Sequence, residues 1–555
     1  MSNSLINTAM SGLNAAQAAL STVSNNIANV SVAGYNRQTA IIAQSNGTST
    51  AAGYIGNGVN VSSVNREYNA FIVNQLMSAS TVNSALTTQS SQAGQIDNLL
   101  SDTTTSLATT MQKFFTGLQT LTSNSGDSAA RQAVLGQAQG MTAQFNSSAK
   151  YLADMSSGVN QQITDNVNQV NNFAAQIAKL NTQITTTRGS TGQEPNALLD
   201  QRDQMVSQLN DIVGVTVTQQ DGDAYNVSFA NGVPLVQGSN TRTIVAIASS
   251  ADTSKLTVGV TQPDGTVSEI AESRITTGAL GGVLQFRKDN LEPAINQLGQ
   301  LALSLGDSFN TVNKGGFDMN SEAGGDFFSF NQPATVSNTK NTGSAVLSTT
   351  FSDVSAVKAS DYVVSYDGTA WSATRSSDGT KITPTAGTDA SGNPTLAFDG
   401  LEVSVTGTAN AKDSFTVKTV SGVAGSLNLA ITDSSKIAAA SELDPTTGLA
   451  GASDNRNAQK LLDLQNAKLV EGKSTLSGAY ASLVSNVGNQ VSTLKTNNTA
   501  QTNIVTQLSA QQQSISGVNT DEEYGDLQRY QQYYLANAQV IQTASTIFDA
   551  IINIR

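Results

Sequence analysis

Apolar residues recur at alternating intervals of three and four positions through the first thirty residues of the chain. One position of this seven-residue repeat holds Ile6, Leu13, Leu20 and Ile27. The other position holds Ala9, Ala16, Val23 and Val30. This spacing is typical of a helix that lies along another helix, so it predicts the first partner of a coiled coil.

The last thirty residues repeat the spacing and predict the second partner. One position of that repeat holds Leu527, Tyr534, Ile541 and Phe548. The other position holds Tyr530, Asn537, Ala544 and Ile551, and only Asn537 interrupts the apolar row. We therefore expect the two ends of the chain to meet as halves of one coiled-coil unit.

Charged side chains are almost absent from both repeats. Arg37 is the single charged residue among the first 65 residues, and residues 530–548 contain none. Exposed coiled coils normally carry Glu and Lys beside the apolar positions, so these helices suit burial against polar neighbours in a tube of subunits. One such helix buries too little apolar surface to offset the entropy of ordering it. We expect both ends to be mobile in the monomer and to order on assembly.

Between the ends, helical and strand-rich segments alternate. Glycines predict a loop-rich stretch from residue 34 to about residue 65. Helical spacing follows at residues 68–100, 163–184, 196–211, 280–305 and 476–515. A period of two predicts strands at 215–218 and 225–229, which flank the turn sequence Asp221-Gly222. Further strands are predicted at 362–364, 401–405 and 415–417, among Asp-Gly turns.

These segments predict an α+β protein of several domains. Residues 1–37 and 519–555 form the terminal coiled-coil core. Residues 38–334 and 431–518 form a long helical-bundle domain with a β subregion near 213–275. Residues 335–430 form an inserted, outward-facing β domain, because they are rich in Gly, Ser, Thr and Asp.

Composition excludes the commoner kinds of site. The chain has 555 residues, a formal net charge of −13, and neither Cys nor His. Zinc centres, thiol nucleophiles and imidazole bases are therefore excluded, and no cofactor or metal is implied. A nucleic-acid partner would need a basic patch. No apolar run is long enough to insert in a membrane, and no cleaved signal peptide is expected.

Two short segments beside the terminal helices are candidate sites. Thr520 is expected to cap the last helix, with Glu523 reaching back to the Thr520 amide as a capping box. In the other segment, Gly34 is expected to adopt a backbone conformation that other residues avoid. Tyr35 would anchor that turn and Arg37 would contact an adjacent subunit. The alternative interpretation of residues 34–37 is a generic loop.

Several motifs resemble those of flagellar axial proteins. Asn25-Asn26-Ile27-Ala28-Asn29 with Gly34-Tyr35, and residues 518–523 followed by Tyr530-Gln531-Gln532-Tyr533-Tyr534, resemble the terminal signatures of flagellar rod and hook proteins. Interior segments resemble the flagellar hook-associated protein 1 family, and they lie at 199–206, 281–287, 316–328 and 398–401. The sequence departs from the family at Ser31-Val32-Ala33 and at Gln539, where an Asn-Thr turn and a Lys are more common.

The resemblance implies a structural role at the junction between the flagellar hook and filament. It implies as partners identical subunits, the hook protein and the second junction protein, with an export chaperone on the C-terminal helix. It also implies an extracellular location reached through the flagellar type III export channel. The expected assembly interface comprises Ile6, Leu13, Leu20, Val23, Ile27, Gly34, Tyr35, Arg37, Leu527, Tyr530, Tyr534, Ile541, Phe548 and Ile551.

Other functions remain open from the sequence alone. A flagellin-like filament subunit or the second junction protein would share the terminal repeats. A surface adhesin would rest only on the polar strands of the inserted region. A carboxylate-dependent wall hydrolase would need two convergent acids, and no such pair stands out.

Overall fold

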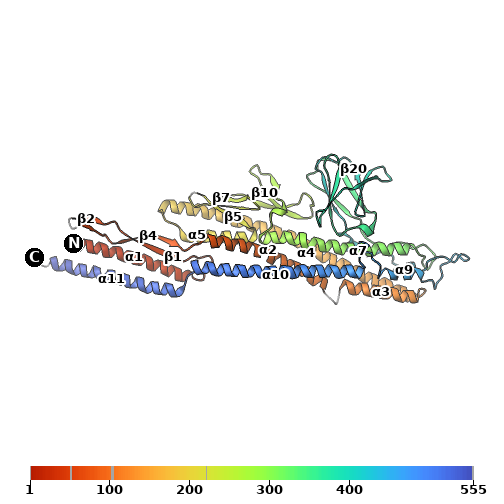
Figure 1. Ribbon diagram of the computed structural model, residues 1–555, viewed down its shortest axis with the longest axis horizontal. Coiled ribbons are helices and arrows are strands. Elements are labelled where there is room, and N and C mark those ends of the chain that lie inside the picture. Colours follow the sequence, from red (N-terminus) through yellow and green to blue (C-terminus); the bar gives the residue numbers. More distant parts are fainter. Residues whose placement is uncertain (1, 51–52, 102–105, 221, 553–555) are drawn as a thin grey trace.

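The molecule is long and thin, and most of its helices run along its long axis (Figure 1). The computed structural model describes residues 2–50, 53–101, 106–220 and 222–552. The longer helices are α1 (Ser2–Asn29), α2 (Ala70–Ser101), α3 (Leu107–Ser123), α4 (Ser128–Thr191), α5 (Asn196–Ile212), α6 (Gly278–Phe286), α7 (Glu292–Lys314), α9 (Arg456–Asp463), α10 (Leu476–Ser516) and α11 (Thr520–Ile552). With several small antiparallel sheets beside these helices, the predicted α+β class is confirmed.

The two terminal helices lie side by side at one end of the molecule, as the repeats predict (Figure 1). α2 and α10 pack together farther along the long axis and continue the line of helices. The predicted apolar row of α10 is buried at Leu476, Tyr480, Leu483 and Val487. The same row is exposed at Ile504 and Ile515, closer to the terminal pair. Other helices of the chain therefore bury the first half of this apolar row, and the half nearer the terminal pair remains partly exposed.

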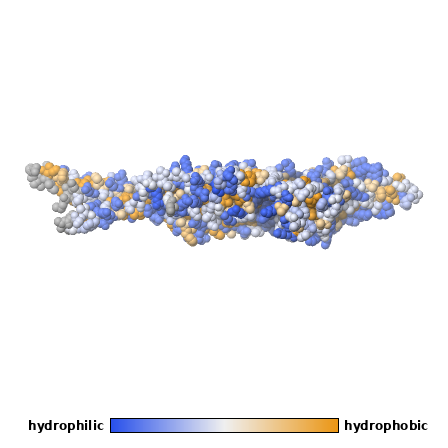
Figure 2. Space-filling view, turned by 90° about the horizontal axis from the view of Figure 1, so that it is seen from above, coloured by the Kyte–Doolittle hydropathy of each residue, from blue (hydrophilic) through white to orange (hydrophobic). Residues whose placement is uncertain are grey.

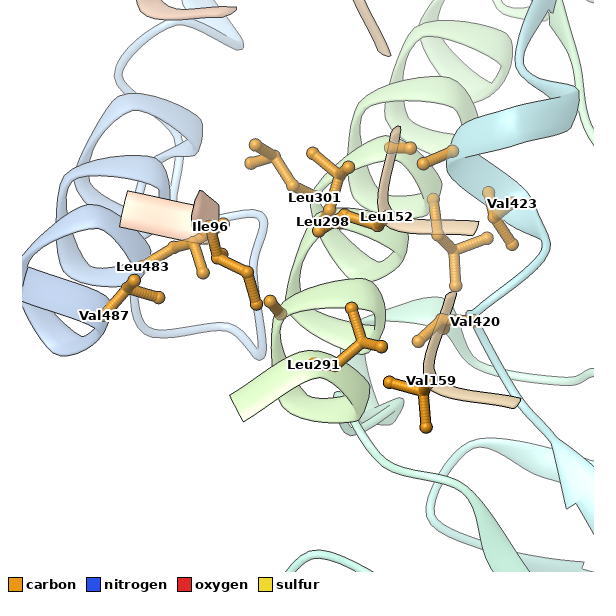
Figure 3. Packing of buried hydrophobic residues seen from close by; sticks show 14 of the residues in the cluster. Ile96, Leu152, Val159, Leu291, Leu298, Leu301, Val420, Val423, Leu483 and Val487 are labelled. Atoms are coloured by element: carbon orange, nitrogen blue, oxygen red, sulfur yellow. The ribbon is translucent and has the colours of Figure 1, made fainter. Parts of the chain in front are cut away.

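A continuous apolar layer holds the middle of the molecule together (Figure 3). Ile96 of α2 packs beside Leu483 of α10. Leu298 of α7 and Leu291, the residue just before α7, lie next to them. Leu152 of α4 then joins this layer to the segment around the short helix α8 (Val423–Ser426). These buried side chains contact one another without a gap and form one continuous cluster.

The 64-residue helix α4 is longer than the prediction. Its C-terminal half buries the predicted residues, among them Ile163, Val170 and Ile177. Its N-terminal half and α3 were missed, although the buried residues Leu107, Met111, Phe114, Leu118 and Leu121 of α3 follow a regular helical spacing. α3 contributes Phe114 and Phe115 to a cluster of rings with Phe309 and the Phe327–Phe328 pair. At 1.5 Å per residue, α4 is about 96 Å long.

The stretch expected to be loops contains paired strands. β1 (Gln38–Gln44) pairs with β4 (Val59–Arg66), and β2 (Thr48–Thr50) pairs with β3 (Gly53–Ile55). The sheet β1–β4 lies against α1. The prediction of loops was wrong. β4 alternates at Val59-Asn60-Val61-Ser62, but its partner β1 is half-buried or exposed on both faces, so only one strand of the pair shows the pattern.

The β subregion predicted near 213–275 forms two small antiparallel sheets. The first contains β5 (Val215–Gln219), β6 (Tyr225–Phe229), β7 (Val233–Gln237) and β8 (Asn240–Thr241). The second contains β9 (Ile244–Ala248), β10 (Leu256–Thr261) and β11 (Val267–Glu269). The predicted pairing of β5 with β6 is confirmed, although Asp221 of the expected turn lies outside the described residues.

The inserted region is a pair of facing antiparallel sheets. One has the order β13-β21-β15-β16-β17, from Ala334–Ser337, Ser414–Lys418, Tyr362–Tyr366, Trp371–Arg375 and Lys381–Ile382. The other has the order β14-β20-β19-β18, from Val346–Phe351, Leu401–Thr406, Pro394–Phe398 and Thr385–Thr388. The ring of Tyr362 in the first sheet lies 5.1 Å from that of Phe398 in the second.

The chain enters and leaves the inserted region at one place. β12 (Phe328–Ser329) precedes the facing sheets, β22 (Asn428–Leu429) follows them, and the two strands pair antiparallel. The boundary residues predicted for each domain stay predictions.

Candidate functional site

The paired terminal helices approach closely because small residues line the contact. Ala9, Ala16, Ala19 and Val23 of α1 are buried, as is Ala544 of α11. Gly12 lies directly against Asn537, where an added Cβ would stand 2.5 Å from the side-chain oxygen. The residue that interrupts the predicted apolar row is therefore accommodated by a glycine on the partner helix.

The larger residues of both repeats are only partly covered within the chain. On α1, Ile6, Leu13, Leu20 and Ile27 are half-buried, and Val30, just after the helix, is exposed. On α11, Leu527, Tyr530 and Ile541 are half-buried, while Tyr534 and Phe548 are exposed. The side chain of Ile551 lies outside the described residues. The intramolecular pair therefore covers only part of the predicted interface.

Other large apolar side chains of the terminal pair are also exposed to solvent. They are Leu5, Met10, Tyr524, Tyr533, Leu535, Val540, Ile547 and Ile552. Hydrophobic residues on the face seen in Figure 2 form small separate patches, and one of them adjoins the chain ends. A soluble monomer rarely leaves so many large apolar residues together on two helices, so this surface has the character of an interface.

A network of polar side chains, called the joint below, lies at the inner end of the terminal pair, and Asn26 is at its centre. The joint comprises Asn26, Tyr35, Asn36, Arg37, Arg66, Asp200 and Glu523. The Oδ1 of Asn26 accepts from the Tyr35 hydroxyl at 2.7 Å and from the Gln38 amide at 2.9 Å. Its Nδ2 donates to the Gln38 carbonyl at 2.8 Å and to Glu523 Oε2 at 3.0 Å. Because the side chain is buried, these four bonds satisfy an amide that water does not reach.

Arg37 and Glu523 connect the N-terminal turn to the start of α11. Arg37 Nε donates to Glu523 Oε1 at 2.6 Å, and the guanidinium also faces Glu522 at 3.2 Å. Burial lowers the pKa of Arg37, but the bond to Glu523 and the nearby carboxylates outweigh it, so the pKa is raised overall. The Arg37 amide donates to the Ser516 carbonyl at 2.8 Å, which ties the turn to the end of α10. The guanidinium expected to reach an adjacent subunit is thus engaged within its own chain.

The predicted capping box does not form as expected. Thr520 is the first residue of α11, and the side-chain oxygen of Asn519 accepts from the Asp521 amide at 3.1 Å. Glu523 turns away from the helix start because Arg37 and Asn26 bind its carboxylate. Asn519 therefore caps the helix in place of Thr520, and Glu523 binds partners from another segment of the chain.

Gly34 and Asn36 connect the same turn to α5. Gly34 has φ +81°, so its predicted special conformation is confirmed, and it lies against Gln204. Asn36 donates to both carboxylate oxygens of Asp200, from its amide at 3.2 Å and from Nδ2 at 2.6 Å. Arg66 at the end of β4 pairs with Asp200 at 3.0 Å. Burial is the largest influence on Asp200 and raises its pKa despite these partners.

Tyr35 lies between the part of the joint around Asn26 and Glu523 and the part around Asp200. Burial raises the pKa of Tyr35 to about 12, and the charges of Asp200 and Glu523 act in the same direction. The phenol therefore stays protonated and donates to Asn26 across the ordinary pH range. Sequence reasoning missed Asn26, Asn36, Arg66 and Asp200 as site residues. The signal was present, because Asn26 and Asp200 belong to motifs that resemble the flagellar signatures.

The contacts described for the joint connect segments of the chain to one another. In the described ranges, no group of three or more acidic side chains could hold a metal ion. No helix in that part of the chain is both long and apolar enough to span a bilayer. The geometry instead fixes how the terminal pair leaves the helical region, through hydrogen bonds among α1, α5, α10 and α11.

A helical pair formed from both chain ends is joined to a longer helical region, and the family matches to both parts identify an axial structural protein of the bacterial flagellum. Residues 6–36 match the family described as flagella basal body rod protein, and residues 510–554 match the C-terminal family of the FlgEFG rod proteins. Residues 93–328 match the helical domain of flagellar hook-associated protein FlgK. Residues 336–419 match the D2-like domain of flagellar hook-associated protein 1. The chain belongs to the flagellar hook-associated protein 1 family.

Individual relatives give the same result. The chain is 56% identical to flagellar hook-associated protein 1 of Escherichia coli and 53% identical to that of Salmonella typhimurium, over the full length of each. The solved structure of the flagellar hook junction protein FlgK from Burkholderia pseudomallei aligns with a TM-score of 0.74 at 31% identity. That alignment covers 80% of this chain and 100% of the other. The protein is thus a structural, non-enzymatic component of the extracellular junction between hook and filament.

Proposed function

We propose that identical copies of this chain assemble through the exposed apolar faces of α1 and α11. The single observation that supports this most directly is the uncovered apolar surface of the terminal pair, in which Leu535 is 66% exposed. Residues 530–548 contain no charge, so packing them against a neighbouring copy strands no charged side chain. Burying the apolar faces on assembly supplies the free energy of association.

In this proposal the joint sets the direction in which the helical region leaves the assembled core. Arg37 and Glu523 keep α11 against the N-terminal turn, and Asp200 keeps that turn against α5. Each subunit therefore meets its neighbours with the same geometry. The inserted region 335–430 faces outward, which agrees with its position at the side of the helices in Figure 1.

The remaining partners follow from the position of the protein at the junction. One edge of the assembly contacts the hook protein, and the other contacts the second junction protein. Before assembly, an export chaperone covers the exposed face of α11. Shielding that face in the cell prevents premature association of the same apolar residues.

The test replaces one exposed residue of the terminal pair and compares it with an equally exposed residue elsewhere. Leu535→Asp should leave the folded monomer intact by circular dichroism and abolish incorporation at the hook tip, as seen by immunolabelling of flagella. Val346→Asp, at a position 60% exposed in the inserted region, is the matched control and should incorporate normally. Normal incorporation of the Leu535 variant would contradict the proposal. Deleting residues 1–37 or 521–555 should give the same loss as Leu535→Asp.

A further inference from the structure

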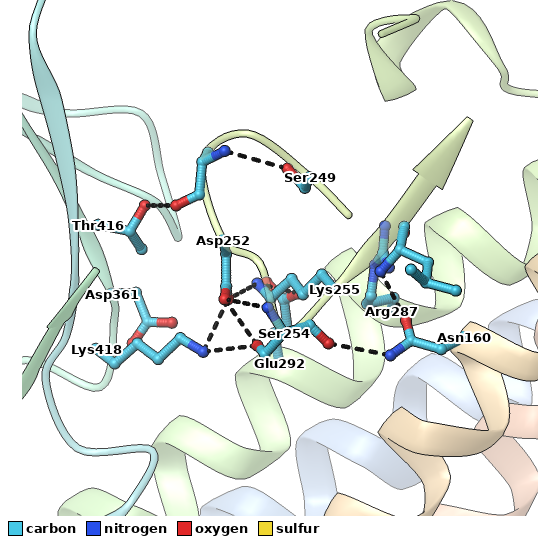
Figure 4. Close-up of polar contacts among 12 residues, drawn as sticks. Asn160, Ser249, Asp252, Ser254, Lys255, Arg287, Glu292, Asp361, Thr416 and Lys418 are labelled. Carbon is cyan, nitrogen blue, oxygen red and sulfur yellow. Dashed lines mark hydrogen bonds and ion pairs between the residues drawn. The ribbon is translucent and has the colours of Figure 1, made fainter. Parts of the chain in front are cut away.

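The inserted region is attached to the helical region at two separate places. The first is its stem, where β12 pairs with β22 and Phe330 lies against Gly306 of α7. The second is a set of polar contacts with the loop between β9 and β10 and with Glu292 of α7 (Figure 4). Glu292 and Gly306 are about 21 Å apart along α7, because a helix rises 1.5 Å per residue. The second attachment therefore acts at a distance from the stem.

We call the second attachment the latch. It comprises residues 250–255 of the β9–β10 loop, Glu292, and Thr339, Asp361, Thr416 and Lys418 of the inserted region. The Thr339 amide donates to the Ser250 carbonyl at 2.9 Å, and the Thr416 hydroxyl donates to the Ala251 carbonyl at 2.9 Å. Both bonds run from the inserted region to the loop, so they break when the two parts separate.

The latch also contains five charged side chains. Lys418 Nζ lies 2.8 Å from the Asp252 carboxylate, and Lys255 Nζ lies 2.7 Å from the Glu292 carboxylate. Asp361, just before β15, supplies a third carboxylate and is buried, as is Asp252. Among the described residues of the latch, two lysines therefore face three acids, and each lysine is paired with an acid other than Asp361.

Protonation of Asp361 balances the charge of the latch. With Asp361 protonated, the charges of two lysines and two acids cancel, whereas ionised Asp361 leaves one negative charge in excess. Burial is the largest influence on Asp361 and raises its pKa to about 6. Burial also raises the pKa of Asp252, but bonds from Lys418 and Ser254 outweigh it, so that pKa is lowered overall. Asp361 thus changes its charge while its neighbour Asp252 stays ionised.

The groups around the latch leave Asp361 as the acid that titrates near pH 6. Burial lowers the pKa of Lys255, but the charge of Glu292 outweighs it, so the pKa is raised overall. The helix α4 faces the latch with the uncharged Asn160, which donates to the Ser254 carbonyl at 3.0 Å. Nearby charged side chains are paired with one another: Arg287 with Glu272 at 2.5 Å, Lys340 with Glu269 at 2.8 Å, and Lys358 with Glu471 at 3.1 Å.

A cavity beside the latch reduces the packing under the inserted region. It has a volume of about 290 Å³ and opens between α4, α7 and residues 421–424, which follow Lys418 along the chain. Ser254 of the latch lines it together with Leu152 and Leu298. Since protein interiors are otherwise closely packed, a small displacement of this base disturbs the helices less than it would in a filled core.

We propose that the latch holds the inserted region in one orientation when Asp361 is protonated and lets it turn about its stem when Asp361 is ionised. The excess negative charge opposes closure because it lies in a buried interface whose lysines are already paired. The closed latch binds the Asp361 proton more tightly than the open latch does. Closure is therefore strongest below the ordinary pKa of 3.8 and weakens as the pH rises through about 6.

Hydrogen exchange of the Thr339 amide in the full chain measures opening of the latch. Mass spectrometry with fragmentation can follow this amide, whose bond to Ser250 crosses between the two parts. Wild type and Asp361→Asn are compared at the same pH, which removes the intrinsic pH dependence of exchange. Wild type should exchange at least about tenfold faster than the variant at pH 7.5, and less than about threefold faster at pH 4.

Dilute urea separates opening of the latch from unfolding of the inserted region. Unfolding exposes much surface and is promoted by urea, whereas opening of the latch exposes little. Exchange of the Thr339 amide should therefore stay nearly constant up to about 1 M urea, while exchange in β14 and β20 accelerates. The same urea dependence for Thr339 and for these strands would overturn the proposal, because the inserted region would then move only by unfolding.

Two lysine changes provide a second measurement. Lys418→Met leaves Asp252 without its closest lysine and should speed Thr339 exchange at pH 7.5 by about tenfold or more. Lys381→Met is the matched control, because Lys381 is exposed in β17 at the far edge of the same sheet, and it should change the rate less than about twofold. Equal effects of the two changes would overturn the proposal. So would equal exchange in wild type and Asp361→Asn at pH 7.5. Either result leaves assembly through α1 and α11 intact, because the latch acts within one chain.

Discussion

Asp361 is a buried carboxyl group at the base of the inserted region, and its replacement gives a quantitative test of the structure (Figure 4). Its Oδ1 accepts from the Thr419 amide at 3.3 Å. Burial is the largest influence and raises the pKa of Asp361 to about 6, from an ordinary value of 3.8. The positive charge of Lys255 opposes this rise, and the negative charge of Glu292 adds to it.

The raised pKa has a defined effect on stability. The folded protein holds the Asp361 proton more tightly than the unfolded chain does. The free energy of unfolding therefore falls as the pH rises from about 4 to about 6 and then stays at the lower value. Because one pKa unit corresponds to about 1.4 kcal/mol, ionised Asp361 lowers stability by ~3 kcal/mol at pH 7.5. Asp361→Asn keeps the acceptor for Thr419 and removes the charge, so it should raise the free energy of unfolding by up to that amount.

Urea unfolding followed by tryptophan fluorescence measures the effect where it occurs. Trp371 is the only tryptophan of the chain. It lies in the inserted region, with its ring 5.1 Å from that of Tyr366 and 6.0 Å from that of Phe415. Asp361 comes just before β15, and Trp371 lies in the neighbouring strand β16, so its emission reports unfolding of the sheet beside Asp361. The Asp361 variant should unfold at higher urea than wild type at pH 7.5, and the difference should nearly vanish at pH 4.

A carboxylate of opposite behaviour in the same region provides the control. Hydrogen bonds from Ser404 and Asn393 hold the pKa of Asp389 at about 2. Its stabilising contribution is present above the unfolded pKa near 3.8 and is lost as the pH falls through about 2. Asp389→Asn should therefore lower the urea midpoint at pH 7.5. A lower midpoint for the Asp361 variant, or an advantage equal at pH 4 and pH 7.5, would refute the reasoning.

Two further changes test the terminal pair and its joint by amide exchange. Gly12→Ala places a Cβ 2.5 Å from the Asn537 side-chain oxygen and should speed exchange in α1. Gly525→Ala, where the added Cβ meets nothing within 4 Å, should stabilise α11 by up to ~1 kcal/mol. Slower exchange in the Gly12 variant would show that the helices are not in contact there. In the second change, Glu523→Gln leaves one side-chain oxygen where two accepted from Arg37 and Asn26. The loss of the charged hydrogen bond should destabilise the start of α11 by ~1–3 kcal/mol. The exposed neighbour change Glu522→Gln should have a much smaller effect, and equal effects would argue against the buried joint.

The sequence predicted the helices of the terminal pair because their apolar spacing is regular. Ile6 and Leu13 of α1 and Leu527 and Ile541 of α11 are partly covered within one chain, as two halves of an interface should be. Whether the ends are mobile in the monomer stays a prediction. The strands from 38 to 66 were missed because β1 shows no alternation and the alternation of β4 is confined to its first four residues.

The joint was harder to predict for a different reason. Asn26 and Glu523 are 497 residues apart in sequence, and hydrogen bonds between polar side chains follow no period. A local interpretation assigned Glu523 to the cap of its own helix. In the folded chain, the charge of Arg37 and the amide of Asn26 compete successfully for the same carboxylate.

The pairing of α1 with α11 also means that the first helix of the chain is covered on this side only when the last helix is present. α1 ends at Asn29, whereas the helix against which it packs begins only at Thr520. In the proposed assembly, a chain that stops early, or loses its last segment to a protease, leaves α1 unpaired and lacks half of the proposed association surface. We expect such a copy to be left out of the junction because it cannot pack against its neighbours.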